Sequence, residues 1–428
     1  TNIKWMTNVD SGWFIAFLQQ FCMQISWKLL QMSYGRITWM YAVPLSLDKK
    51  SRDDIDRAWA NEIRNYLMRV TKMEHNMPGI YTESVAVSSY FSRHPNVTVS
   101  EVLQEEIGYA VVDIGGGSTD FSLWKKEGGQ LMWETSVNIA GRKIFSTRAF
   151  QYIEKLRDVL DPEGDKEIRK QLASIKDLGK RSGDEVAVVF FERFIGEYGE
   201  KLRTGVAGRW GKPNMDWIGE FRAQIALGAA MILFCTGQMT GEAIETRKFK
   251  PAEGGVFYIT LAGNGANLFD WIYNDSWNKA DAQEKDIFNH IFWDGVNSRI
   301  YAAKNEYDKF RMLNVRIVKS PNPKKEVAMG LFQVNKIIAN VERVKTGYEG
   351  KDIMKWKDIF FESVKAHFKD NSSLSYLLDN GIWNENLQKD YRWQNVANND
   401  PKEGCCSTMM NISEKLYNWL ADTWRYRS

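Results

Sequence analysis

Apolar residues recur along this chain at two spacings, one typical of helices and one typical of strands. Over residues 15–30 they return every three or four positions, which predicts an amphipathic helix with one buried face. Residues 36–43, RITWMYAV, are mostly apolar and end at Pro44, which predicts a strand. A second helix is expected over residues 51–70, because a serine followed three residues later by an aspartate begins its periodic stretch.

The middle of the chain predicts a glycine-linked hairpin and one further glycine turn. Residues 109–123 read YAVVDIGGGSTDFSL, two apolar strands around a glycine run, and a third strand is expected over 131–139. The helix expected over 83–91 is rich in small residues and suited to lie close to another backbone. Residues 255–270 read as a buried strand, a glycine turn and the start of a helix. These elements predict an α/β protein.

The glycine run has the composition of a phosphate-binding turn. Gly115, Gly116 and Gly117 let the backbone approach a ligand, so successive N–H groups can converge on an anion. Ser118 and Thr119 add hydroxyl donors next to them. Asp113 ends the preceding strand, where a carboxylate can hold the water shell of Mg²⁺.

Composition narrows the function classes. The chain has 57 basic and 54 acidic residues, interspersed, so neither nucleic acid nor a membrane surface is expected as a partner. Four cysteines and four histidines, none at ligand spacing, argue against structural zinc and indicate a reduced, cytoplasmic protein. The longest apolar run, residues 225–235, is too short to span a bilayer and is interpreted as a buried helix.

The hairpin resembles the second phosphate loop of the ATPase superfamily that joins actin, sugar kinases and the seventy-kilodalton heat-shock chaperones. The neighbouring motifs follow the chaperone order, although Ser84 replaces a proline of the family pattern. These motifs are Val43-Pro44, Glu83-Ser84-Val85-Ala86, Ala140-Gly141-Arg142, Gly263-Asn264-Gly265 and the segment SPNPKKEVAMGLF with Val327, Ala328 and Gly330.

This resemblance implies an actin-like (ribonuclease H-like) fold of two lobes, each with a mixed sheet flanked by helices, and ATP or ADP with Mg²⁺ between them. The N–H groups of residues 115–119 would hold the phosphates, Gly141 and residues 263–265 would complete the nucleotide site, and Asp113 and Glu83 would be catalytic, with Asp113 holding Mg²⁺ through water. A protein partner would sense the nucleotide state. The helix carrying Gly330 would lead back to the first lobe and pack across the hinge.

The resemblance also implies a division of the chain. Residues 1–106 would be the remainder of the first lobe, 107–145 and 251–345 the core of the second lobe, 146–250 an inserted, mostly helical subdomain, and 346–428 a helical extension. The adenine clamp expected in the inserted subdomain is not evident, since EFRAQIAL offers only Arg222.

The front of the chain departs from the family. Asp10-Ser11-Gly12 runs into bulky Trp13 and Phe14, so we interpret it as a helix cap rather than as the first phosphate loop, and the lysine that reaches the γ-phosphate in the chaperones is missing. The chain is therefore expected to be a fragment of a longer ATPase or a degenerate relative.

Other functions remain open from the sequence. One is a scaffold or interaction protein that keeps the fold without hydrolysis, and another is a phosphohydrolase, since exopolyphosphatases carry a similar Asp-Ile-Gly-Gly-Gly-Ser-Thr run. A Rossmann site is disfavoured because Leu268 replaces the third glycine and no acidic ribose partner follows. The strand end at Asp113 is expected to lie outside the core, so that Asp113→Ala would leave the fold intact.

Overall fold

The computed structural model describes most of the first three quarters of the chain. The described residues are 12–43, 49–76, 80–93, 106–125, 131–137, 140–210, 212, 215–245, 256–273, 277–279, 282–300, 314–321, 325–331, 360, 363–364 and 366–367. Nearly all of the helical extension expected over 346–428 lies outside them.

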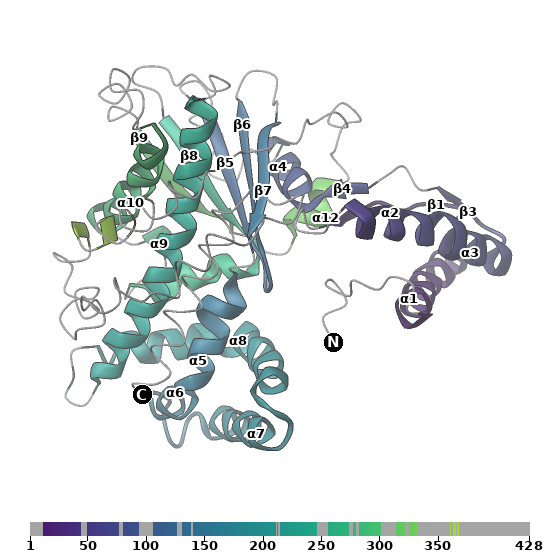
Figure 1. Ribbon diagram of the computed structural model, residues 1–428. Coiled ribbons are helices and arrows are strands. Elements are labelled where there is room, and N and C mark those ends of the chain that lie inside the picture. Colours follow the sequence, from purple (N-terminus) through teal and green to yellow (C-terminus); the bar gives the residue numbers. More distant parts are fainter. Residues whose placement is uncertain are drawn as a thin grey trace.

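A five-stranded mixed sheet forms the centre of the molecule (Figure 1). Its order is β7-β6-β5-β8-β9. β6 runs in the direction opposite to the other four strands, so it is antiparallel to β5 and β7, while β5, β8 and β9 are parallel. The strands are β5 (Glu106–Ile114), β6 (Thr119–Lys125), β7 (Leu131–Val137), β8 (Val256–Ala262) and β9 (Asn314–Lys319). This order confirms the predicted α/β fold with a mixed sheet.

Helices cover both faces of this sheet. Successive side chains of a strand point to opposite faces, and consecutive apolar residues therefore make both faces apolar. On β5, Ala110 and Val112 join the main core with α9 (Asp216–Glu245) and α10 (Ala282–Ile300). Val111 points to the opposite face and packs with Val87 of α4 (Glu83–Arg93).

Helix α9 is the longest helix described, and it exceeds the length expected from the apolar run. By length and composition it could cross a membrane, but 94% of its apolar stretch is buried inside the protein. Two glycines let it cross α10 at contact distance: a Cβ on Gly237 would lie 2.9 Å from the backbone nitrogen of Val296, and one on Gly295 would lie 3.2 Å from the Cα of Gly237. The interpretation as a buried helix is confirmed.

Between β7 and α9 the chain forms the helical layer at one end of the sheet (Figure 1). The elements are η4 (Arg142–Ser146), α5 (Thr147–Gln151), α6 (Ile153–Asp158), α7 (Lys166–Ser182) and α8 (Asp184–Ala207). Their buried residues belong to the same core cluster as the sheet and α9. Most of the described residues between 146 and 245 are thus helical.

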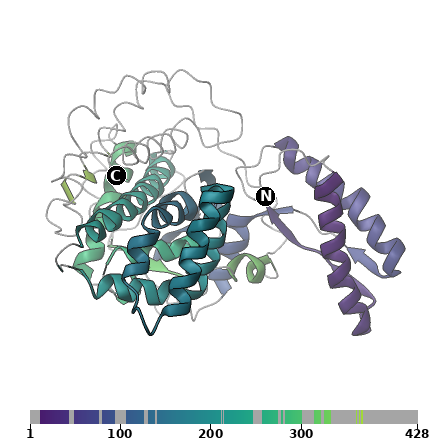
Figure 2. The same cartoon turned by 90° about the horizontal axis from the view of Figure 1, so that it is seen from below.

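The N-terminal residues form a separate unit that projects from one side of the sheet in both views (Figures 1 and 2). Helix α1 (Gly12–Gln31) packs on a continuous helical stretch made of α2 (Lys49–Arg57), the π-helical η2 (Ala58–Ile63) and α3 (Arg64–Thr71). The predicted strand over 36–43 is broken into β1 (Arg36–Thr38) and β2 (Tyr41–Val43). Each pairs in parallel with one short strand, β3 (Glu74–Asn76) or β4 (Ile80–Thr82).

The first-lobe sheet expected from the resemblance is thus reduced, within the described residues, to these two-stranded pairs. The chain then enters α4 directly from β4, and α12 (Glu326–Leu331) packs against α4 at the joint between the N-terminal unit and the sheet. The helix that carries Gly330 therefore packs against the helix rich in small residues.

Candidate functional site

Three turns that are far apart in the sequence meet at one end of the sheet. They are the hairpin between β5 and β6, the turn at Ala140–Arg142 and the turn between β8 and η5 (Asn264–Trp271). The backbone N–H of Gly141 donates to Gly115 O over 3.0 Å, and that of Arg142 donates to Gly116 O over 3.2 Å. The strand ends of one sheet edge therefore bring the predicted glycine motifs together.

Close contact between backbones explains most of these glycines. A Cβ on Gly141 would lie 2.8 Å from the Cα of Gly265, and one on Gly265 would lie 2.9 Å from the carbonyl oxygen of Gly115. Gly263 has φ +72°, a conformation that L side chains rarely adopt, and any Cβ there would overlap the carboxylate of Asp113. Packing alone thus requires Gly141, Gly263 and Gly265.

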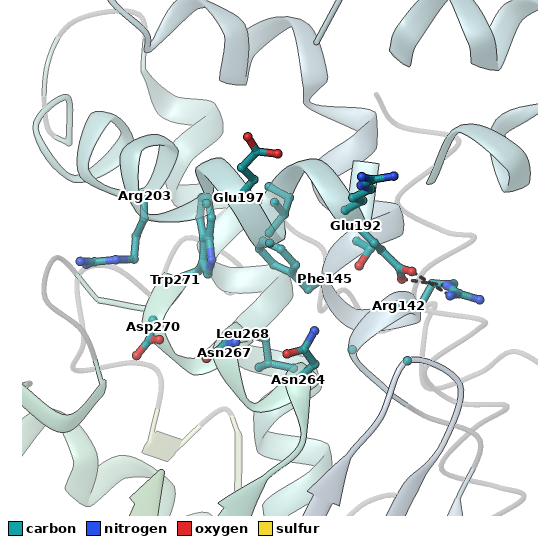
Figure 3. A pocket seen from close by; sticks show the side chains of 18 of the residues that line it. Arg142, Phe145, Glu192, Glu197, Arg203, Asn264, Asn267, Leu268, Asp270 and Trp271 are labelled. Carbon is teal, nitrogen blue, oxygen red and sulfur yellow. Dashed lines mark hydrogen bonds and ion pairs between the residues drawn. The ribbon is translucent and has the colours of Figure 1, made fainter. Parts of the chain in front are cut away.

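A cavity of about 1030 Å³ opens between these turns and helix α8 (Figure 3). The glycine turns and the start of η4 form one end, η5 forms the floor, and α8 forms the opposite wall. Its lining residues are Gly115, Gly116, Gly141, Arg142, Phe145, Ser146, Val189, Glu192, Arg193, Ile195, Gly196, Glu197, Gly199, Glu200, Arg203, Asn264, Gly265, Asn267, Leu268, Asp270 and Trp271.

Two of the lining glycines have no packing reason to be glycine. A Cβ on Gly116 would meet only the Nη2 of Arg142, at 3.7 Å, and a Cβ on Gly196 would meet nothing within 4 Å. Neither has a positive φ. Glycine inside a helix costs about 1 kcal/mol relative to alanine. Gly196 in the middle of α8 therefore weakens that helix, and no close packing contact requires a glycine there. Both positions leave room in the cavity.

Five of the charged residues that line the cavity are held in ion pairs. Arg142 binds Glu192 through two hydrogen bonds, Nε to Oε1 at 2.8 Å and Nη2 to Oε2 at 2.7 Å (Figure 3). Arg203 binds Glu200 one turn away on α8, with Nη2 to Oε1 at 2.6 Å. Figure 3 shows Arg142 and Arg203 at opposite ends of the cavity. Below Arg203, Asp270 pairs with Lys319 of β9.

The structure places the predicted phosphate-binding residues in two groups. Gly115, Gly116, Gly141, Asn264 and Gly265 line the cavity. The remaining four predicted cofactor-binding residues, which are Gly117, Ser118, Thr119 and Gly263, are not among the lining residues.

One backbone donor of the hairpin is already engaged, and one of its predicted hydroxyl residues is buried. The N–H of Gly115 donates to Ser118 O over 2.8 Å and closes the turn. Thr119 is fully buried at the start of β6, paired with Ile114. The part of the hairpin that faces outward is therefore its tip, around the exposed Gly116.

Asp113 is buried, contrary to the expectation that its strand end lies outside the core. Its exposure is 7%, because β6 and β8 flank it on both sides and α4 covers the same face. Asp120, also buried, lies directly opposite on β6. The carboxylate of Asp113 lies against Gly263, next to the cavity-lining Asn264.

This arrangement fits a magnesium ion that is shared with a phosphate ligand. Mg²⁺ in such sites is held by one or two carboxylates, water and phosphate oxygens. Asp113 and Asp120 supply two carboxylates at the strand ends behind the glycine turns. Among the described residues no group of three histidine, cysteine or acidic side chains is placed to hold a metal ion by itself.

Glu83 begins α4 and is half-buried, but it is not among the residues that line the cavity. Another carboxylate lies at that helix end. Glu134 of β7 accepts hydrogen bonds from Thr82 Oγ1 at 2.7 Å and Ser84 Oγ at 2.8 Å. Burial raises the pKa of Glu134 above its ordinary value despite these two hydrogen bonds.

Arg222, the one basic residue available in EFRAQIAL, does not reach the cavity. It is 1% exposed, and its guanidinium lies 4.8 Å from the ring centre of Trp210. The basic residues of α8 that line the cavity are Arg193 and Arg203. Sequence reasoning missed them because the periodicity of a charged helix does not tell which turn faces a cavity; the glycines Gly196 and Gly199 were the available signal.

Comparisons with known protein families and with curated proteins give no match to this chain. Among solved structures, the chain is similar to MreB5 of Spiroplasma citri bound to ADP, at 13% identity over 76% of each chain with a TM-score of 0.30. It is also similar to MreB5 of Spiroplasma citri bound to AMPPNP, at 13% identity over 69% of this chain and 67% of that one, with a TM-score of 0.24.

Proposed function

We propose that this chain is a nucleotide-binding module of actin-like fold that takes Mg-ATP or Mg-ADP in the cavity between the glycine turns and α8. The observation that carries this proposal is the pair of glycines, Gly116 and Gly196, which lie on opposite walls of the cavity and have no packing reason to lack a side chain. A ligand that approaches both walls closely explains their absence of side chains.

The two ends of the cavity suit the two ends of a nucleotide. The tip of the hairpin supplies backbone donors and has an arginine beside it, which favours phosphate. The far end combines Asn267, Asp270, Arg203 and the ring of Trp271, which favours a ribose and a base. The volume of about 1030 Å³ lies at the upper end of ligand sites, which typically span ~300 to 1,000 Å³.

Nucleotide occupancy would act on the N-terminal unit through the sheet. Asp113 stands on β5 between the cavity and the face covered by α4, and α4 contacts α12 at the joint. Mg²⁺, when bound, would neutralise the phosphate charge next to Asp113 and Asp120. We expect a protein partner to bind differently according to the position of the N-terminal unit, and so to respond to the nucleotide state.

The test is calorimetric titration of the full chain with Mg-ADP, Mg-ATP and adenosine, with phosphate release measured separately. We expect a dissociation constant in the micromolar range for Mg-ADP, about 8 kcal/mol of binding free energy. A chain that is folded by circular dichroism and binds none of these ligands at millimolar concentration contradicts the proposal. Binding without phosphate release assigns the chain to the non-hydrolysing alternative.

A further inference from the structure

The arginine beside the glycine hairpin is held at a position where a phosphate group would compete for it. Arg142 follows Gly141 directly, and its backbone N–H is bonded to Gly116 O. Its side chain returns to the same hairpin, because a Cβ on Gly116 would lie 3.7 Å from Nη2. The backbone and the guanidinium of one residue thus flank the exposed tip of the hairpin.

The partner of this guanidinium comes from the opposite wall of the cavity. Glu192 lies on α8, 50 residues away in sequence, and binds Arg142 through both carboxylate oxygens. The two side chains are 34% and 25% exposed, so the pair is reached by solvent and is screened by it. An ion pair at this degree of exposure is exchangeable.

A phosphate fits the guanidinium as well as a carboxylate does. The planar fork of arginine donates two parallel hydrogen bonds to either group, and a terminal phosphate carries more charge than one carboxylate. Arg203, the other paired arginine of the cavity, stands at the far end and is held within α8 by Glu200 (Figure 3). Arg142 is therefore the paired arginine placed for the phosphate end.

We infer that Arg142 reads the phosphate chain of the ligand: it leaves Glu192 when a di- or triphosphate occupies the hairpin, and Glu192 sets how much phosphate charge is needed to draw it away. This inference rests on the proposed function for the nucleoside part of the ligand, but its phosphate part can be tested alone. It assigns Arg142 as the specificity-determining residue and Glu192 as the competing anion.

The exchange also gives the phosphate end of the cavity two states, one with the Arg142–Glu192 pair formed and one with it broken. With the pair formed, Arg142 and Glu192 tie the turn at residues 140–142 to α8 across the phosphate end. With phosphate bound, Glu192 is released and the tie between the wall and the turn is broken. The movement needs only the side chain of Arg142, because its backbone stays bonded to the hairpin.

The experiment compares adenosine, Mg-ADP and inorganic tripolyphosphate as ligands of the full chain by calorimetry. The variants are Arg142→Ala, Arg142→Lys and Glu192→Gln. Arg157→Ala serves as the matched control, because Arg157 forms a 2.7 Å ion pair with Glu154 at a similar exposure, 32%, and does not line the cavity.

We expect Arg142→Ala to weaken Mg-ADP and tripolyphosphate binding tenfold or more and to leave adenosine binding unchanged. Arg142→Lys keeps the charge without the fork and falls between the two. Glu192→Gln removes the competing charge, so it tightens Mg-ADP binding severalfold, and the double variant with Arg142→Ala shows no such gain. The control matches the wild type for every ligand.

The inference is overturned if Arg142→Ala weakens adenosine and Mg-ADP equally, or if Glu192→Gln weakens Mg-ADP as Arg142→Ala does, since either result makes the pair a structural tie only. Wild-type binding of tripolyphosphate that depends on Arg142, without any nucleotide binding, overturns the proposed function while it upholds the inference. If Arg142→Ala does not fold, Glu192→Gln and Arg142→Lys decide the question.

Discussion

Gly330 of α12 lies directly against the backbone of Ala86 in α4. A Cβ on Gly330 would overlap the carbonyl oxygen of Ala86 and would lie 2.5 Å from its carbonyl carbon and 3.2 Å from the nitrogen of Tyr90. The two helices thus meet backbone to backbone at the joint between the N-terminal unit and the sheet. Small residues on both sides, expected from the sequence, are what permits this approach.

Gly330→Ala should therefore separate α12 from α4. The added methyl group has no space, so we expect a loss of about 1–3 kcal/mol in the free energy of unfolding, as for other overpacked sites. Urea unfolding followed by circular dichroism measures it. Met329→Ala, on the same short helix at a side chain that is 42% exposed, is the control and should change stability by about 0.5 kcal/mol or less. Equal effects of the two substitutions would rule out the close approach.

Gly196→Phe should block the cavity while the protein stays folded. Its side chain enters open space within the cavity, and replacing a mid-helix glycine removes part of the cost of about 1 kcal/mol that glycine carries relative to alanine. We expect Mg-ADP affinity to fall about tenfold or more, at least ~1.4 kcal/mol, with unfolding free energy equal or higher. Calorimetry and urea unfolding check the two parts.

The matched control for this variant is Val186→Phe. Val186 lies on the same helix, is 43% exposed and does not line the cavity. It should bind Mg-ADP as the wild type does. Undiminished binding by Gly196→Phe would place the nucleotide elsewhere.

Glu134→Gln should change how stability depends on pH. Burial raises the folded-state pKa of Glu134 above its unfolded value, which is near 4.5, so ionisation opposes folding. The stability that the protonated carboxyl contributes is fully present below the unfolded pKa and is lost as pH rises through the folded pKa. Glutamine accepts the same hydrogen bonds from Thr82 and Ser84 without ionising.

We therefore expect the unfolding free energy of Glu134→Gln, measured relative to the wild type, to increase as pH rises from below 4.5. Urea unfolding at a series of pH values gives the difference. A difference that stays constant across the series would show that Glu134 titrates as an exposed carboxylate does.

Asp113→Asn should separate the metal from the nucleotide. The substitution keeps the shape of a buried side chain and removes the charge that would attract Mg²⁺ through water. We expect ADP binding in the presence of a chelator to be unchanged and the gain in affinity from added Mg²⁺ to be lost. Asp177→Asn, at an exposed side chain of α7, should keep that gain. If Asp113→Asn keeps the full gain as well, Mg²⁺ binds without this carboxylate.

Asp113→Ala should destabilise the protein more than a substitution at an exposed strand end would. Asp113 is 7% exposed and lies between two strands. Removing its carboxylate would leave neighbouring buried polar groups without a hydrogen-bond partner, so we expect the free energy of unfolding to fall by about 1–3 kcal/mol. Thermal unfolding compared with Asp113→Asn measures this cost. Equal stability of the two variants would contradict it.

The sequence by itself determined the local elements and the glycine turns. The apolar run YAVV before the glycines and the alternating residues after them predicted β5, the hairpin and β6, since a strand buried on both faces reads as a near-continuous apolar run and a tight turn favours glycine. Small residues predicted that α4 and α12 approach another backbone.

Only the tertiary structure decided which side chains share the cavity. Arg142 and Glu192 are 50 residues apart, and no local pattern distinguishes them from other charged residues of half-exposed helices. Sequence periodicity also left Asp113 at a strand end without revealing that β6, β8 and α4 bury it. Burial and partnership come from the packing of distant segments, because each depends on which element covers a residue rather than on the residue's own neighbours along the chain.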